Sequence, residues 1–215
     1  MLQKVSLILI VLVLIGCNSQ EKKLPDDFDF GSIQENVYQN NFFDMEITFD
    51  PDWVIQSKQQ MNSIQERGVN MISGDSKTLK ADIKASMVNT AYLFSLFKYE
   101  FGSTVEYNPS FMVVAENTKN FPGIKRGKDY LLNVKKTLKQ TQLNYTFDKE
   151  IYTIEIGGES FDVMQADLIF FNKTIIQEYF STVTKGFCLS FIVTYSNKDQ
   201  KSELYTIVNH IKITK

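Results

Sequence analysis

The chain is poor in the residues that most often carry out chemistry or cross-link small folds. Among 215 residues it has one histidine, His210, and two cysteines, Cys17 and Cys188. One histidine excludes a histidine-rich metal site, and two cysteines exclude a disulfide framework. The sequence contains no Gly-x-Ser-x-Gly elbow, phosphate-binding loop, Cys-x-x-Cys pair or His-Glu-x-x-His motif. The hydrolase, nucleotide-binding, redox and zinc-protease classes that use these motifs are therefore not indicated.

The charges are nearly balanced, which excludes another class of function. The chain has 23 Lys and Arg residues against 25 Asp and Glu residues, a formal net charge of −2. A nucleic-acid-binding protein needs a basic face with aromatic side chains on it. Because the basic residues here are scattered among a similar number of acids, we expect no nucleic-acid partner.

An apolar run opens the chain. Lys4 gives it a positive start, Val5–Ile15 is almost entirely apolar, and the small residue Gly16 follows. This order is typical of a secretory signal peptide. At ~1.5 Å per residue the run covers roughly half of a ~30 Å hydrocarbon core, so it is too short to span a membrane comfortably.

The end of this run resembles the lipobox of bacterial lipoproteins. Leu14, Ile15, Gly16 and Cys17 stand in the lipobox order. The resemblance implies that residues 1–16 are removed as a signal peptide and that Cys17 becomes the lipid-bearing N-terminus. Two or three acyl chains, at ~0.8 kcal/mol per buried CH₂, hold a protein firmly. We therefore expect a bacterial cell-envelope lipoprotein anchored in the membrane through palmitate-type chains on Cys17.

The same resemblance bears on sorting and on the second cysteine. Asn18 follows Cys17, whereas Asp at that place is associated with inner-membrane retention, so the outer membrane is the expected location. With Cys17 carrying lipid, Cys188 has no disulfide partner within the mature chain.

The remaining chain divides into a tether and one domain. Residues 17–35 are mostly polar or acidic and have no sustained apolar period, so they are predicted to be the lipidated cysteine and a flexible tether. Asp26, Asp27 and Asp29 fit a solvated acidic linker better than a cation cage. Residues 36–215 have an ordinary size for one globular domain.

The first half of this domain mixes strands and helices. Alternation over 37–49 predicts a hairpin leading into a half-buried strand. Ser57, with Gln60 three residues later, predicts a capped helix, and Ser76 predicts the start of a second one. In the run Thr90–Tyr99 both the odd-numbered and the even-numbered positions are mostly apolar, as expected of a central strand covered on two faces.

The chain then crosses a loop and returns to strands. Phe111–Ala115 is a predicted strand, Asn120–Lys128 is irregular, and Asp129 is placed to cap a third helix. Residues 152–195 alternate long β-type runs with two-residue turns, which indicates an antiparallel meander. A last helix is predicted to begin at a Ser196 cap.

The order of elements resembles a PsbP-like domain. The resemblance rests on the aromatic strand 42–49, the Asp-Pro-Asp-Trp turn 50–53 with the helix after it, and the closing strand, helix and Ile211–Ile213. It implies an α+β fold: an antiparallel sheet of about six to eight strands with helices packed on both faces. It also implies a binding or assembly role, without an active site common to the family.

Several residues are candidates for chemistry, each with a structural alternative. Asp162 with Asp167, or Glu155 with Glu178, can be imagined as paired acids across the meander, but acids on the wet face of an antiparallel sheet are ordinary. Cys188 is most simply a small buried hydrophobe.

Three more sites remain as alternatives. His210 fits a helix terminus. Trp53, Tyr92 and Phe94 fit core aromatics better than a ligand box. Lys125, Arg126 and Lys128 form a basic cluster before a helix, where an anion can bind, although a solvated loop fits as well.

The sequence therefore predicts a membrane-anchored, non-catalytic binding or assembly module with a protein partner and with no cofactor or metal. An envelope hydrolase using carboxylates or Cys188 is one alternative. A carrier of a small ligand or metal is the other, and a sizeable apolar pocket between sheet and helices would favour it.

Overall fold

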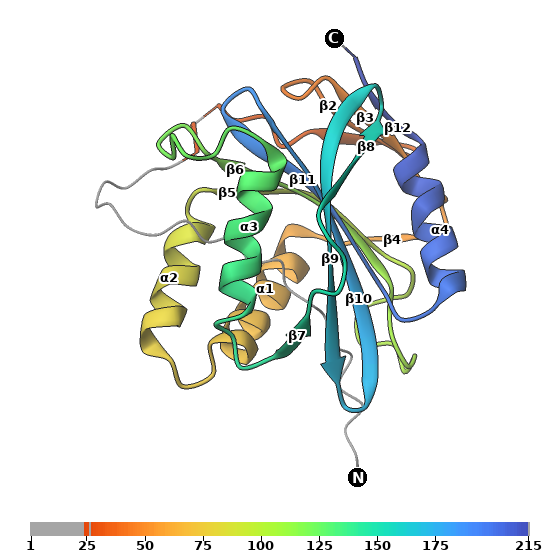
Figure 1. Ribbon diagram of the computed structural model, residues 1–215. Helices are drawn as coiled ribbons and strands as arrows, with labels where there is room; N and C mark the ends of the chain where they lie inside the picture. Colours follow the sequence, from red (N-terminus) through yellow and green to blue (C-terminus); the bar gives the residue numbers. More distant parts are fainter. Residues whose placement is uncertain (1–23, 26, 215) are drawn as a thin grey trace.

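The computed structural model describes residues 24–25 and 27–214, so the apolar run and Cys17 lie outside the described residues. In chain order the elements are β1 Ser32–Gln34, β2 Val37–Asn40, β3 Met45–Thr48, β4 Val54–Ile55, α1 Lys58–Ser73, α2 Lys77–Met87, β5 Thr90–Phe97, β6 Ser110–Asn117, α3 Gly127–Leu138, β7 Asn144–Thr146, β8 Tyr152–Ile156, β9 Glu159–Phe170, β10 Lys173–Thr184, β11 Phe187–Tyr195, α4 Lys198–Asn209 and β12 Ile211–Ile213 (Figure 1).

A large antiparallel sheet forms the centre of the molecule. Its strands lie in the order β4-β5-β6-β11-β10-β9-β7, with β8 also pairing with β9. The predicted meander is confirmed, because β8 to β11 pair in sequence through tight turns. A smaller antiparallel sheet, β1-β2-β3-β12, joins the two ends of the domain. The α+β fold class with a mainly antiparallel sheet is thereby confirmed.

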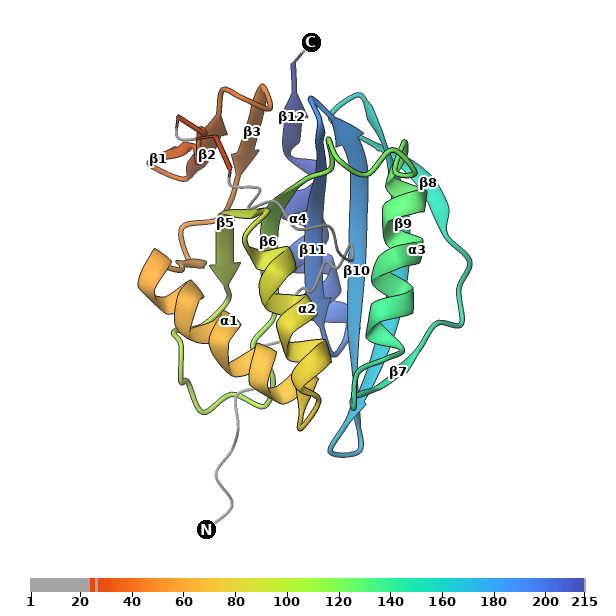
Figure 2. The same cartoon turned by 90° about the vertical axis from the view of Figure 1, so that its left-hand side faces the viewer.

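Both faces of the large sheet are covered. Helices α1, α2 and α3 lie on one face, whereas α4 and the small sheet lie on the other (Figures 1 and 2). The side chains of β11 alternate between the two cores: Phe191 packs on the α4 side, and Cys188 and Ile192 pack beneath α1 to α3. Every residue of β11 is buried, including Ser190 and Thr194, whose hydroxyl groups pair with those of Ser181 and Ser110. The predicted packing of helices on both faces is confirmed.

Local sequence signals set the start of the first two helices. Ser57 caps α1 through a capping box, in which the Ser57 side chain accepts from Gln60 N–H and the Gln60 side chain accepts from Ser57 N–H. Ser76 caps α2 by accepting from Leu79 N–H. Each cap satisfies N–H groups that have no partner within the helix.

Two other predicted caps are wrong by one to three residues. α3 begins after Arg126, and Asp129 lies inside its first turn, accepting from the N–H groups of Lys125 and Arg126. The cap of α4 is Asn197, not Ser196. In both cases a neighbouring polar residue competes for the same free N–H groups, so the local pattern has more than one solution.

The folded part begins earlier than residue 36. Phe28 is buried in the core beside Phe187, Asp29 accepts hydrogen bonds from Gly31 and Asn41 N–H, and β1 follows. The predicted tether is therefore wrong in its last part, because a single Phe in a polar stretch leaves no periodic signal. Among the described residues, no helix is long and apolar enough to cross a membrane.

Candidate functional site

A cavity of about 600 Å³ opens between the start of α1 and the outer part of β5. We call it the α1–β5 cavity. It is lined by Leu24, Phe30, Gly31, Gln56, Lys58, Met61, Asn62, Gln65, Met87, Thr90, Tyr92, Leu93, Phe94 and Ser95. Figure 2 shows β5 at one side of the large sheet with α1 next to it. The volume lies within the ~300–1,000 Å³ that small-ligand sites commonly have.

The cavity exists because β4 is very short. Val54 and Ile55 pair with Phe97 and Leu96, and the Gln56 N–H then donates to Ser95 O at 3.0 Å. At the next residue, Ser57, the chain begins the capping box and turns into α1. The sequence signal for a helix thus ends the edge strand after two residues, and the rest of β5 has no strand on that side among the described residues.

This edge position corrects one prediction. Within the run Thr90–Tyr99, the strand β5 up to Phe97 is covered on both faces, as its apolar residues at both odd and even positions indicate, but it is not central in the sheet. Burial on two faces and position in a sheet are independent properties, because a helix and a second sheet can cover an edge strand as well as a central one.

Two buried polar atoms in this cavity find no hydrogen-bond partner among the described residues. They are Gln56 Oε1 and Ser95 Oγ, on residues that are only 6% and 3% exposed. The Gln56 side chain is held in place because its Nε2 donates to Val54 O at 3.0 Å. Leaving a buried polar group unpaired costs about 1–3 kcal/mol, so such groups usually have a partner. The atoms therefore favour a ligand that donates hydrogen bonds here.

The rest of the described lining is mainly apolar, with the polar residues Asn62, Gln65 and Thr90 and one charged residue. Met61 and Met87 contribute flexible, polarisable side chains, and Tyr92 adds an aromatic ring. Lys58 is the one charged lining residue, and its Nζ lies 5.8 Å from the centre of the Phe30 ring. The cavity thus combines apolar walls with a few fixed polar groups, which is the usual composition of a binding site.

The basic cluster predicted at Lys125, Arg126 and Lys128 lies at the start of α3. The carboxylate of Asp129 accepts from Lys125 and Arg126 N–H at 3.0 Å each, and Asp162 accepts from Lys128 N–H at 2.7 Å. Two of the chain's own carboxylates thus hold the N–H groups that an external anion would need.

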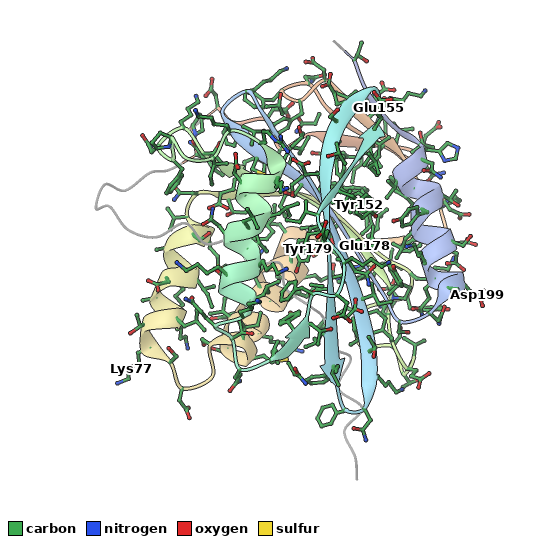
Figure 3. All side chains as sticks on the ribbon, viewed as in Figure 1. Lys77, Tyr152, Glu155, Glu178, Tyr179 and Asp199 are labelled. Carbon is green, nitrogen blue, oxygen red and sulfur yellow. The ribbon has the colours of Figure 1, made fainter. Side chains whose placement is uncertain are left out.

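The predicted acid pairs do not meet. Asp162 and Asp167 are five residues apart on β9 and therefore point to opposite faces of the sheet. Glu155 lies opposite Ser160 near the start of β9, whereas Glu178 lies opposite Gln165, five residues further along β9. Figure 3 shows Glu155 near the upper end of the sheet and Glu178 beside Tyr152 at its middle. The structure therefore offers no two-carboxylate site at these positions.

Glu178 is buried under α4, contrary to the expectation of an acid on a wet face. It is 1% exposed, Lys201 Nζ lies 3.1 Å from its Oε1, and Tyr205 OH donates to its Oε2 at 3.0 Å. Burial, with the negative charge of Glu178 as the next cause, raises the pKa of Tyr205 and Tyr195. The pair joins α4 to the sheet, which is a structural role.

The remaining candidates lie away from solvent or at a terminus. Cys188 is fully buried, and burial raises the pKa of its thiol, which disfavours the reactive thiolate. His210 ends α4, where its Nδ1 lies 2.6 Å from Thr206 O. Within the part of the chain that the structure describes, no three His, Cys, Asp or Glu side chains gather as metal ligands would.

Sequence reasoning preferred the core to a ligand box for Tyr92 and Phe94, and both residues also line the cavity. It missed Gln56 and Ser95, since an isolated Gln or Ser carries no pattern. The one available signal was the capping box of Ser57 and Gln60, which shows where the chain leaves the sheet to begin α1.

No family model and no curated protein sequence matches the chain. Among solved structures it is similar to a PsbP (CyanoP) from Synechocystis sp. PCC 6803, at 10% identity and a TM-score of 0.48 over 83% of this chain and 91% of that chain. It is also similar to LpqN, a protein involved in cell envelope biogenesis of Mycobacterium tuberculosis. The identity is 11% and the TM-score is 0.45, over 80% of this chain and 83% of that chain.

A third similar structure is PA94 of unknown function from Pseudomonas aeruginosa, at 12% identity and a TM-score of 0.38 over 50% of this chain and 73% of that chain. At identities of 10–12% and TM-scores below 0.5, these likenesses transfer no function and no site residue to this chain.

Proposed function

We propose that this protein is a lipid-anchored cell-envelope protein whose single domain is a non-catalytic binding module, and that it binds its partner at the α1–β5 cavity. The observation that carries the proposal is the cavity itself, with Gln56 Oε1 and Ser95 Oγ buried and unpartnered among the described residues. We do not propose catalysis. Glu178 forms an ion pair with Lys201, Asp162 accepts a hydrogen bond from Lys128 N–H, and Cys188 is buried in the core.

The anchor part of the proposal is supported by the lipobox order Leu14, Ile15, Gly16 and Cys17. It is tested by mass spectrometry of the mature N-terminus and by membrane fractionation. We expect acylated Cys17 at the N-terminus and protein that stays with the outer membrane. Cys17→Ala should release the domain from the lipid fraction. An unmodified N-terminus downstream of Cys17 on freely soluble protein would contradict the anchor.

The binding part is tested by recovering partners from envelope membranes with the full anchored chain. Asn62 is exposed and lines the cavity mouth, so Asn62→Trp should block entry without disturbing the core. Ser63→Trp is the matched control, since Ser63 is the next residue of α1, exposed and outside the lining. We expect a protein partner that is retained by the control and lost with Asn62→Trp. Equal recovery with both variants would place binding elsewhere.

A carrier of a small apolar ligand is the second candidate, because the cavity volume of about 600 Å³ suits one. It predicts co-purification of a small molecule with the control variant and not with Asn62→Trp.

A further inference from the structure

We propose that the α1–β5 cavity receives an extended apolar peptide segment of the partner protein, which adds a strand to the outer edge of β5. The proposal rests on the binding role proposed above and names the chemistry of the occupant. Its basis is the open sheet edge, the two unpartnered polar atoms, and the charge of the lining.

The edge of β5 is the first observation. β5 has eight residues, but β4 pairs with only Leu96 and Phe97. Ser95 O accepts from Gln56 N–H, and beyond it Thr90 and Tyr92 to Phe94 line the cavity and pair with no strand of the described chain on that side. An unpaired strand edge presents a row of N–H and C=O groups, and an extended peptide is the ligand that matches such a row.

The unpartnered side chains select the same class of ligand. Gln56 Oε1 can only accept a hydrogen bond, whereas Ser95 Oγ can donate or accept. A peptide backbone carries one N–H and one C=O at each residue, so a strand beside β5 can supply both partners. A hydrocarbon chain would leave both atoms without a hydrogen bond, which is unfavourable for buried polar groups.

The walls fit alternating side chains. Successive residues of a strand point to opposite faces, so one set would face Met61 and Met87 on the helical side. The other set would face Phe30 and Gly31 near the small sheet. Methionine side chains adapt to different shapes, which suits a site that accepts several apolar side chains.

Charge indicates what one end of the peptide carries. Lys58 is the first residue of α1, and the first turn of that helix has no acidic residue. The positive end of the helix dipole and the Lys58 side chain therefore lie together at the mouth without an acid among the lining residues. A peptide with an Asp or Glu near this end would complement both.

Once residues 1–16 are removed, as the proposed lipid anchor requires, the chain's own N-terminal segment does not have this composition. Residues 18–23, which precede the lining residue Leu24, are Asn, Ser, Gln, Glu, Lys and Lys. They include no apolar side chain, so they do not match the apolar walls. We therefore assign the strand to a different molecule.

The test is selection from a phage-displayed library of seven-residue peptides. Every second position is Val, Ile, Leu or Phe, and one terminal position is Asp or Glu. The target is the full anchored chain in lipid nanodiscs. An enriched peptide is then synthesised with a fluorescent label and titrated by anisotropy. We expect N-methylation of its central backbone amides to weaken binding at least tenfold, because a strand needs those N–H groups.

Two variant pairs locate the peptide. Gln56→Met removes the unpartnered oxygen, and Gln59→Met makes the same change at an exposed position of α1 outside the lining. Lys58→Glu reverses the charge at the first residue of α1, and Lys77→Glu does so at the first residue of α2. We expect about fivefold or greater weakening with Gln56→Met and Lys58→Glu, and none with the two controls. Thermal melting shows whether each variant folds. If Gln56→Met does not fold, the pair of surface variants at Lys58 and Lys77 tests the inference instead.

Three results would overturn the inference. One is a library without enrichment, another is an enriched peptide that binds Lys58→Glu as tightly as the wild type, and the third is insensitivity to N-methylation.

Dansyl-undecanoic acid, titrated in parallel, separates the two proposals. If it binds the wild type and not Asn62→Trp while no peptide enriches, the cavity still binds a ligand and only the peptide is wrong. If neither probe binds and Asn62→Trp recovers the same partners, both proposals fail.

Discussion

Glu116 shows how strongly burial alone changes the chemistry of one residue. It lies on β6 beneath α2 and α3, where Tyr130 OH and Ser86 Oγ donate to its carboxyl group at 3.0 and 3.2 Å. Burial raises the pKa of Glu116 from 4.5 to about 8, and the two hydrogen bonds act in the opposite direction. The side chain is therefore largely protonated at neutral pH and serves as a neutral partner of the two hydroxyl groups.

This raised pKa predicts how stability depends on pH. Between pH 4.5 and about 8 the folded chain holds a proton on Glu116 that the unfolded chain releases. The free energy of unfolding should therefore fall as pH rises through this range, by up to about 1.4 kcal/mol per unit. Glu116→Gln should flatten that slope in urea titrations, whereas Glu66→Gln at an exposed position should not. An unchanged slope in Glu116→Gln would contradict the prediction.

Phe171 is an exposed residue in an unfavourable backbone conformation. It stands at the tip of the β9–β10 hairpin with φ +46° and 79% exposure, next to Asn172 at φ +62°. Two-residue turns of this kind favour Asn or Gly, because other side chains are strained at positive φ. Phe171→Asn should raise the free energy of unfolding by about 0.5–1 kcal/mol in denaturant titration. Phe171→Ala removes the ring contact with Phe170 but keeps the strain, so it should bring no such gain.

At the scale of elements, Gly127 determines how closely α3 approaches the sheet. A Cβ at this first residue of α3 would overlap the backbone carbonyl of Ser181 on β10. Gly127→Ala should therefore push the helix away and cost about 1–3 kcal/mol, despite the better helix propensity of alanine. Gly123→Ala is the control, because no atom lies near its Cβ position. Equal melting temperatures for the two variants would show that α3 shifts without cost.

The turn from β4 into α1 is the element that creates the proposed site. The capping box of Ser57 and Gln60 can be read from the sequence, and so can the helix that follows. What cannot be read is that the strand before it ends after two residues while its neighbour β5 runs for eight. Strand lengths in a sheet are set by which partners lie alongside, and that depends on residues far away in the chain.

At the scale of the whole molecule, the large sheet is shared by two cores. Cys188 lies on β11, which has β6 on one side and β10 on the other and is buried on both faces. Its thiol packs in the core beneath α1 to α3, so reaching it requires opening that core, which is built on the same central strands as the core on the α4 side. In a Cys17→Ala chain, the rate of thiol labelling should rise with denaturant in parallel with global unfolding. Labelling much faster than unfolding would reveal a local opening on the α1–α3 side.

Most of the secondary structure could be predicted from the sequence alone: the hairpins of the meander, the caps at Ser57 and Ser76, and the coverage of β5 on both faces. These features depend on residues close together in the chain or on the simple alternation of apolar side chains. It also provides the lipobox order at Cys17, on which the proposed anchor depends. Phe28 is the counterexample, since its burial depends on Phe187 and Phe43, which local periodicity cannot indicate.

Which polar residues are paired depends on the three-dimensional arrangement of the chain. It placed Lys201 beside Glu178, put Asp162 at the start of α3, and separated the acids that the strand pattern had suggested as pairs. It also left Gln56 Oε1 and Ser95 Oγ buried and unpartnered among the described residues beside an open strand edge. Hydrogen-bond satisfaction is a property of three-dimensional neighbours, so a site defined by unmet hydrogen bonds cannot be recognised in sequence order alone.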